Sequence, residues 1–279
     1  MILGLLLVLV YLVYPAAAGV IALLPGRANV GSPPPGFAEI TLTANDGVPL
    51  QGWYRAPENG AAIILLHGAG GSRATMRGYA EMLARHGFGV LAVDLRGHGQ
   101  SQGATNRLGW QGTLDVGAAV QFLQSRADVQ RIGGLGSSMG GEVLLGAASA
   151  YPQIAAIVAD GATARSIEEM LALETNRPLV RNFTARVMMT TVQLLSGQQP
   201  PKPLLDSMIE ADATQFLLIA GGANAREVAY NQLFQATLGD RAALWIAPDA
   251  AHTAAFVRHP EEHERRVLDF LQAQLVNLR

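Results

Sequence analysis

The chain has 279 residues, of which 49% are apolar and 15% are charged. This length suits one large α/β domain with a well-buried core, and two equal domains are not expected. A formal net charge of −2 and the lack of any run of lysines or arginines exclude the electrostatic pattern of a nucleic-acid-binding protein.

Residue types that bind metals or cofactors are scarce or scattered. The chain has no cysteine, which excludes disulfides, thiolate metal sites and a cysteine nucleophile. Its six histidines lack the spacing of metal ligands, so we expect no metal ion. The glycine-rich segment 68–71 is not followed by the Lys-Ser/Thr pair of a phosphate-binding loop. We therefore expect no nucleotide and no other cofactor.

Residues 1–24 (MILGLLLVLVYLVYPAAAGVIALL) contain no charged side chain. About 20 apolar residues suffice to cross a bilayer as a helix. Because the run is longer than a signal-peptide core and has no basic region before it, we expect a single-pass membrane anchor. Arg27 on its C-terminal flank favours a cytoplasmic location for the folded domain. The alternatives are a signal cleaved on export, since Pro15 precedes a small-residue AAAG segment, and a helix docked on a soluble domain.

A linker and a hairpin follow this segment. Residues 25–36 (PGRANVGSPPPG) are rich in proline and glycine, and we expect them to form neither helix nor strand. The folded domain is expected to span residues 37–279. It begins with two runs, 37–43 and 50–54, that are separated by Asn45-Asp46-Gly47, a strong hairpin signal.

Strands and helices then alternate, which predicts a doubly wound, mostly parallel sheet flanked by helices. The apolar run 61–66 has the composition of a parallel strand buried on both faces. Residues 163–212 break the rhythm with apolar helical stretches and a Gln-Pro-Pro-Lys-Pro segment, so we expect a small helical cap over the carboxyl edge of the sheet. The expected strands are 61–66, 89–93, 132–135, 155–159, 215–220 and 243–246, and the expected helices are 74–86, 114–126, 142–150, 228–238 and 260–275.

The stretch most informative about chemistry is IGGLGSSMGG at residues 132–141. Gly136, Ser138 and Gly140 have the Gly-x-Ser-x-Gly spacing of a nucleophile elbow, a sharp strand-to-helix turn that exposes a strained serine. The glycine spacing is centred on Ser138, so we interpret Ser138 as a nucleophile and its neighbour Ser137 as structural. A serine hydroxyl also needs a base to remove its proton and a pair of donors to hold the oxyanion.

Two further segments meet these needs. His252 follows the last predicted strand, at the edge where open α/β sheets place their sites, and is the expected base. The segment His67-Gly68-Ala69-Gly70-Gly71 follows a central strand and leaves backbone N–H groups free. The N–H groups of Ala69 and Met139 are therefore the expected oxyanion donors. The other histidines are interpreted as structural, at positions 67 and 98, or as solvated, at positions 86, 259 and 263.

With these motifs together, the chain resembles the α/β-hydrolase fold superfamily, and in particular its bacterial members that carry an N-terminal membrane helix. The resemblance covers residues 37–275. It implies hydrolysis of an ester, thioester or amide through an acyl-enzyme, with Ser138 as nucleophile, His252 as base and an acid between them in sequence. It rests on the hairpin before Gly52-Trp53-Tyr54, the His67-Gly68 turn, the segment DLRGHGQS at 94–101, the elbow at 136–140 and His252.

The acid is where the chain departs from this family, which usually places an aspartate a few residues after the strand expected at 215–220. Here that loop is GGANARE at residues 221–227, with Asn224 near the expected place. An asparagine cannot stabilise the imidazolium by charge. We predict Glu227, three residues further along, as the acid, and Asp160, at the end of the preceding strand, as the next candidate. Asn224 itself and Asp249 are the remaining alternatives.

The expected function is that of a membrane-anchored serine hydrolase of the esterase, lipase or thioesterase kind. Its substrate would be a small acyl ester or a lipid-like molecule, and no nucleic-acid partner is expected. The missing aspartate supports one alternative, a catalytically impaired hydrolase-fold protein that binds an apolar ligand or partner. Haloperoxidase, C–C bond and amide hydrolysis are other chemistries that the same residues perform.

Overall fold

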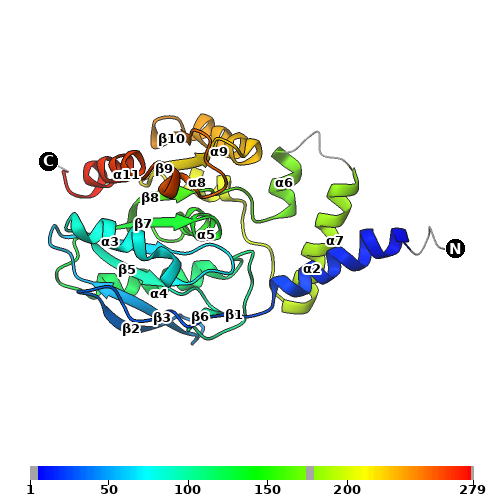
Figure 1. Ribbon diagram of the computed structural model, residues 1–279, viewed down its shortest axis with the longest axis horizontal. Coiled ribbons are helices and arrows are strands. Elements are labelled where there is room, and N and C mark those ends of the chain that lie inside the picture. The colour runs from blue at the N-terminus through cyan, green and yellow to red at the C-terminus, as the bar shows by residue number, and fades with distance from the viewer. Residues whose placement is uncertain (1–5, 174–178, 278–279) are drawn as a thin grey trace.

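The central feature of the fold is a mostly parallel β-sheet (Figure 1). The computed structural model describes residues 6–173 and 179–277. Within these residues, eight strands form the sheet in the order β10-β9-β8-β7-β4-β5-β3-β2. This confirms the predicted α/β architecture. The strands are β2 (Ala38–Thr43), β3 (Pro49–Arg55), β4 (Ala61–Leu66), β5 (Gly89–Val93), β7 (Arg131–Ser137), β8 (Ile154–Asp160), β9 (Gln215–Gly221) and β10 (Ala242–Ala247).

Strand pairing is parallel from β10 to β5 and antiparallel at the edge formed by β5, β3 and β2. The predicted hairpin joins β2 to β3, and Gly47 in its turn has a φ of 83°. Because the parallel strands all end at the same edge of the sheet, the loops that follow β4, β7, β8, β9 and β10 gather there. This edge therefore positions the candidate site.

Helices bury both faces of the sheet. In β4, the even-numbered residues pack into one hydrophobic core and the odd-numbered residues pack into the other. All residues of β4 are buried, which explains its unbroken apolar run. The first core is completed by α4 (Gly112–Gln124), α5 (Met139–Ala147) and α9 (Ala225–Leu238), and the second by α3 (Arg77–Arg85), α10 (Ala255–Arg258) and α11 (Pro260–Leu275).

In the described residues, three helices stand between β8 and β9, where the sequence predicts a cap at 163–212. They are α6 (Ile167–Leu173), α7 (Leu179–Ser196) and α8 (Leu204–Glu210). Residues 174–178 of the expected cap lie outside the described residues. Leu204 and Met208 of α8 are fully buried in the first core, so α8 belongs to the body of the domain. In Figure 1, α6 and α7 stand away from the sheet.

One carboxylate joins the two ends of this inserted segment. Oε2 of Glu169 accepts hydrogen bonds from the N–H groups of Arg165 at 2.9 Å and Ser166 at 3.2 Å. Its Oε1 accepts a hydrogen bond from the N–H of Leu204. Burial raises the pKa of Glu169. These bonds fix the start of α6 beside the start of α8.

The N-terminal segment packs along α7. A π-helical turn (Leu9–Val13) leads into α2 (Tyr14–Ala22), which lies beside α7 (Figure 1). Pro15 and Gly19 are the buried residues of α2. A Cβ at Gly19 would lie 2.7 Å from the carbonyl oxygen of Met188. The glycine therefore allows the two helices to approach closely.

The described residues do not support the membrane anchor expected at residues 1–24. In the described part of the chain, no helix combines the length and the apolar character needed to cross a bilayer. Residues 1–5 lie outside that part. The helical segment ends at Ala22, and the chain then turns toward the sheet. The single-pass anchor, and the membrane location inferred from it, are therefore not supported.

The segment 25–36 also differs from its expected form, because it contains a short strand. β1 (Gly26–Arg27) pairs in parallel with β6 (His98–Gly99). The N–H of Gly26 donates to the carbonyl oxygen of Gly97 at 2.9 Å, and the N–H of Ala28 donates to that of Gly99 at 3.1 Å. A Cβ at Gly26 would lie 3.0 Å from the ring of His98, so the glycine makes room for this pairing.

Leucine at position 19 should force α2 away from α7, because the backbone of Met188 cannot move aside as a flexible side chain would. Overpacking of this kind costs about 1–3 kcal/mol. We expect Gly19→Leu to speed native-state amide exchange across α7, measured by mass spectrometry. Ala17→Leu, at an exposed position of the same helix, should leave that exchange unchanged. Equal protection of α7 in the two variants would contradict the packing described above.

Candidate active site

The turn between β7 and α5 places Ser138 at the carboxyl edge of the sheet. Ser138 has φ 50° and ψ −120°, a backbone conformation that residues other than glycine rarely adopt. A Cβ at Gly136 would lie 2.3 Å from the carbonyl carbon of Gly140. A Cβ at Gly140 would lie 2.4 Å from the carbonyl oxygen of the last residue of β4. Both glycines are therefore required by close backbone contacts, and the geometry is that of a nucleophile elbow.

His252 approaches Ser138 from the loop between β10 and α10. Its Nε2 lies 2.9 Å from Oγ of Ser138. Gly161 lies beside the imidazole, where a Cβ would be 3.0 Å from Cε1. In the described residues, the non-glycine positions with positive φ are Ser138, Asp249 and Thr253. Backbone strain is thus concentrated at the serine and around the histidine, and nothing in the residue pattern indicates the strain at Thr253.

The other ring nitrogen of His252 contacts Glu227. Nδ1 lies 2.7 Å from Oε2, and Glu227 is fully buried whereas 46% of the His252 side chain is exposed. The second carboxylate oxygen accepts the N–H of Gly221 at 2.6 Å. The hydrogen bond to Glu227 raises the pKa of His252, although partial burial opposes this. In the neutral ring, Nδ1–H donates to Glu227, which leaves Nε2 to accept the hydroxyl proton of Ser138.

Asn224, near the expected position of an aspartate, is the N-cap residue of helix α9. Its Oδ1 accepts the N–H of Glu227 at 3.3 Å. Its Nδ2 donates to Oε2 of Glu227 at 3.2 Å. The Asn224 side chain therefore contacts both the backbone N–H and the carboxylate of Glu227, while its own N–H donates to the carbonyl oxygen of Gly221. Asn224 thus holds the carboxylate that contacts His252 and does not contact the imidazole through any hydrogen bond of the described residues.

The other candidate acids point elsewhere. Asp160 is buried, and its Oδ2 accepts the hydroxyl of Tyr79 at 3.2 Å. Nε2 of His263 lies 3.6 Å from the same oxygen. Asp249 is exposed in the turn after β10. The structure therefore brings His252 together with Glu227 and directs Asp160 toward Tyr79.

His263 was expected to be solvated, and this expectation is wrong. Its side chain is fully buried, with its ring edge-on to those of Tyr79 and Phe256. The amphipathic pattern of α11 places it on the apolar face, because Val267 and Leu271, four and eight residues further along, are also buried. That spacing is the signal by which His263 could have been found.

The candidate oxyanion donors come from two segments that meet at Ser138, the loop after β4 and the start of α5. Met139 is the first residue of α5, so its N–H has no acceptor inside the helix. Ala69 follows Gly68, where a Cβ would lie 3.3 Å from Cβ of Ser138. No backbone hydrogen bond in the described ranges uses the Ala69 N–H. In the described residues, neither N–H therefore has a backbone acceptor of its own, which is the condition that an oxyanion donor must meet.

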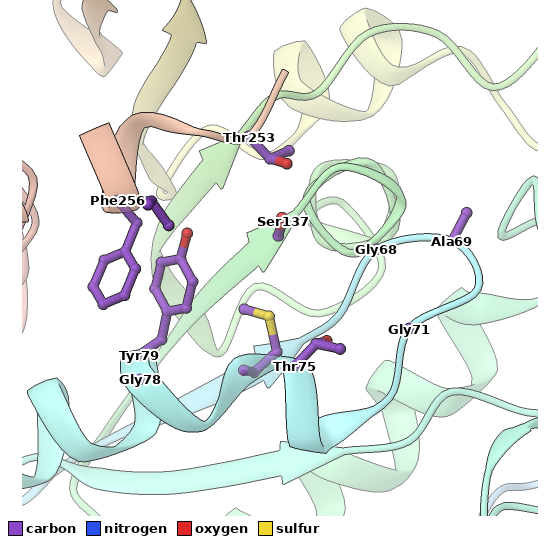
Figure 2. Close-up of a pocket in the computed structure, with 11 residues that line it drawn as sticks. Gly68, Ala69, Gly71, Thr75, Gly78, Tyr79, Ser137, Thr253 and Phe256 are labelled. Carbon is purple, nitrogen blue, oxygen red and sulfur yellow. The ribbon is translucent and has the colours of Figure 1, made fainter. Parts of the chain in front are cut away.

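A cavity of about 410 Å³ opens beside the elbow. Figure 2 shows Ser137 at the end of β7, Gly68 and Ala69 on the loop that faces it, and the rings of Tyr79 and Phe256 on the opposite side. Its lining comes from residues 68–79, from Ser137 and from residues 253–257. None of the lining residues belongs to the segment 163–212 that was expected to cover the site.

The remaining polar groups near the site provide no set of metal ligands. His67 is fully buried, and its Nε2 accepts the N–H of Leu95 at 3.1 Å. Burial lowers the pKa of His67 to about 3, so the ring is neutral and structural. Across residues 6–173 and 179–277, no group of three or more His, Asp or Glu side chains is arranged to hold a metal ion.

Known proteins share this fold and its sequence pattern. An esterase from Pyrococcus furiosus has a similar structure, with a TM-score of 0.73 over 90% of this chain and 99% of that chain, at 26% identity. The thiohydrolase aneE of Aspergillus aculeatus is 30% identical over 183 residues, which are 62% of this chain and 55% of that protein. The protein YfhR of Salmonella typhi is 34% identical over 129 residues, so the match spans only 43% of that relative and 43% of this chain.

The family of this protein is shown by the part of its sequence that contains the elbow. Residues 61–204 match the sequence pattern of the alpha/beta hydrolase fold. This range begins at the central strand β4 and includes Ser138 and the start of α8. Because the match covers more than half of the chain and agrees with the observed sheet, the protein belongs to the α/β-hydrolase fold family.

Proposed function

We propose that this hydrolase-fold protein is a serine hydrolase that cleaves carboxylic esters or thioesters through an acyl-enzyme on Ser138. The observation that carries the proposal is the hydrogen-bonded chain from Glu227 through His252 to Ser138, with N···O distances of 2.7 and 2.9 Å. Similarity to an esterase and to a thiohydrolase supports these two bond types. The substrate class is a small acyl ester or a lipid-like acyl compound.

The residues of the candidate site have distinct roles in the proposed reaction. Nε2 of His252 takes the hydroxyl proton as Oγ of Ser138 attacks the carbonyl carbon, and negative charge moves to the carbonyl oxygen beside the N–H groups of Ala69 and Met139. When the intermediate collapses, His252 gives this proton to the departing alcohol or thiol. Water then repeats both steps on the acyl-enzyme, which releases the acid and restores Ser138. Glu227 accepts the hydrogen bond from Nδ1–H of His252 and stabilises the imidazolium.

The same carboxylate weighs against an impaired catalyst that only binds ligands. That alternative was based on the absence of an aspartate from the usual loop. A buried glutamate 2.7 Å from Nδ1 of His252 provides the negative charge that an asparagine lacks. The hydrogen-bonded series Glu227, His252 and Ser138 therefore favours an enzyme over a binding protein.

Replacement of Ser138 tests the proposal directly, because it removes the attacking oxygen. We expect Ser138→Ala to lose about 10⁶ in kcat on p-nitrophenyl butyrate. The variant should also resist labelling by a fluorophosphonate probe, whereas Ser137→Ala should still be labelled. Circular dichroism checks that each variant is folded. A folded wild-type protein that neither reacts with the probe nor cleaves any acyl ester or thioester would refute the proposal.

Replacement of the carboxylates identifies the acid. Loss of the charge beside His252 matters mainly in the transition state, so Glu227→Gln should lower kcat by at least ~10² and change KM little. Asp160→Asn leaves the chain from Glu227 to Ser138 intact and should lower kcat by less than ~10-fold. Steady-state kinetics on one ester measure both effects. A larger loss of kcat in Asp160→Asn than in Glu227→Gln would identify Asp160 as the acid.

The pH dependence follows from the raised pKa of His252. Only the neutral ring accepts the proton of Ser138, so kcat/KM should rise with pH through a midpoint above the ordinary histidine value of about 6.5. Glu227→Gln removes the largest cause of the shift, and the midpoint measured in its residual activity should move to lower pH. An unchanged midpoint in this variant would mean that another group controls the acid limb.

A further inference from the structure

The cavity beside the elbow, which Ser137 borders, has one wall that the proposed proton transfer does not use. Tyr79 and Phe256 stack with a ring-centroid distance of 4.2 Å and an interplanar angle of 23°. His263 packs edge-on against both rings, at 5.5 and 5.3 Å. Asp160 accepts the Tyr79 hydroxyl at 3.2 Å. Asp160 and His263 are buried, so their contacts with the two rings fix the position of this aromatic wall from the protein interior.

The rest of the lining is rich in hydroxyl groups. Ser137, Thr75, Tyr79 and Thr253 all border the cavity (Figure 2). The hydroxyl of Thr75 donates to the carbonyl oxygen of Ser72 at 2.7 Å, and that of Tyr79 donates to Asp160. Their oxygens therefore remain able to accept a hydrogen bond from a ligand. Such a lining suits a small group that carries hydroxyls and rests its carbon skeleton on an aromatic ring.

The histidine loop indicates which part of a substrate would lie here. In the proposed reaction, His252 must give its proton to the leaving oxygen, so the leaving group lies on the His252 side of Ser138. Thr253 follows His252 directly, and Phe256 and Val257 continue from the same loop into α10. The cap segment contributes nothing to this lining. The wall of the cavity and the proton donor thus come from one continuous stretch of chain.

We propose that this cavity is the leaving-group subsite and that it accepts an alcohol bearing further hydroxyl groups. The inference rests on the proposed ester hydrolysis. Phe256 and Tyr79 set the shape of the subsite, and Asp160 is a positioning residue that acts through Tyr79. Gly78 sets its size, because a Cβ there would lie 3.0 Å from Cε1 and 3.3 Å from Cζ of Phe256.

The test compares leaving groups at constant acyl group and acyl groups at constant leaving group. The first comparison uses 2,3-dihydroxypropyl and pentyl butyrate, and the second uses 2,3-dihydroxypropyl acetate and octanoate. Wild type should prefer the dihydroxypropyl over the pentyl ester by at least ~10-fold in kcat/KM, a difference within the range that a few pocket contacts provide. No preference, or a preference for the pentyl ester, would overturn the polyol assignment.

Two variants change the size of the cavity in opposite directions, since Phe256→Ala enlarges it and Gly78→Leu narrows it. Phe256→Ala should reduce the dihydroxypropyl preference by at least ~10-fold while the acetate-to-octanoate ratio changes by less than ~2-fold. Phe183→Ala, which removes an exposed phenylalanine from α7, is the matched control and should change neither ratio. Gly78→Leu should narrow the cavity and lower kcat/KM for both large leaving groups relative to methyl butyrate by at least ~10-fold.

The outcomes separate this inference from the proposed function. If Phe256→Ala and Gly78→Leu change the acyl ratio instead, the cavity binds the acyl group and the inference is wrong. If both variants react with the fluorophosphonate probe and neither ratio changes, the cavity is not a subsite. If wild type itself neither reacts with the probe nor turns over any ester, the proposed function fails, and that result does not depend on Phe256 or Gly78.

Discussion

The geometry of the candidate site depends on one buried side chain, the carboxylate of Glu227. A carboxylate removed from water costs several kcal/mol unless it is paired and hydrogen-bonded. Here the N–H of Gly221, the amide of Asn224 and the ring of His252 all contact it. These groups come from the end of β9, the start of α9 and the loop after β10. The carboxylate can be accommodated only when all three segments are in place, so the site and the local fold form together.

Much of the fold could be predicted because its signals are local. Continuous apolar runs indicated the buried parallel strands, and two glycines spaced around Ser138 indicated the elbow. The choice between Glu227 and Asp160 was harder to make, since both end up near the same edge and only side-chain direction separates them. The membrane anchor expected at residues 1–24 is not supported in the described residues. An apolar helix has the same composition whether lipid or another helix covers it, and the contact of Gly19 with α7 involves residues far apart in sequence.

Two buried carboxylates near the carboxyl ends of neighbouring strands contact different parts of the proposed site. Glu227, after β9, contacts the imidazole, whereas Asp160, at the end of β8, contacts the phenol of Tyr79. The backbone of Asp160 also contributes, because its carbonyl oxygen accepts the N–H of Ser138 at 2.7 Å. Asp160 therefore connects the strained elbow to the aromatic wall. The carbonyl oxygen of Asp160 thus acts on the backbone of the nucleophile, whereas its carboxylate acts on the wall of the cavity.

The bonds that Glu169 makes have a consequence for how this domain tolerates change. Its carboxylate binds the chain both where the inserted helices begin, at Arg165 and Ser166, and where they end, at Leu204. The segment between these points is therefore a loop whose closure is fixed at its base. Closure entropy depends only weakly on loop length. The length of the chain between Glu169 and Leu204 can therefore vary at little cost in closure entropy, provided that the hydrogen bonds of Glu169 at the base of the segment are kept.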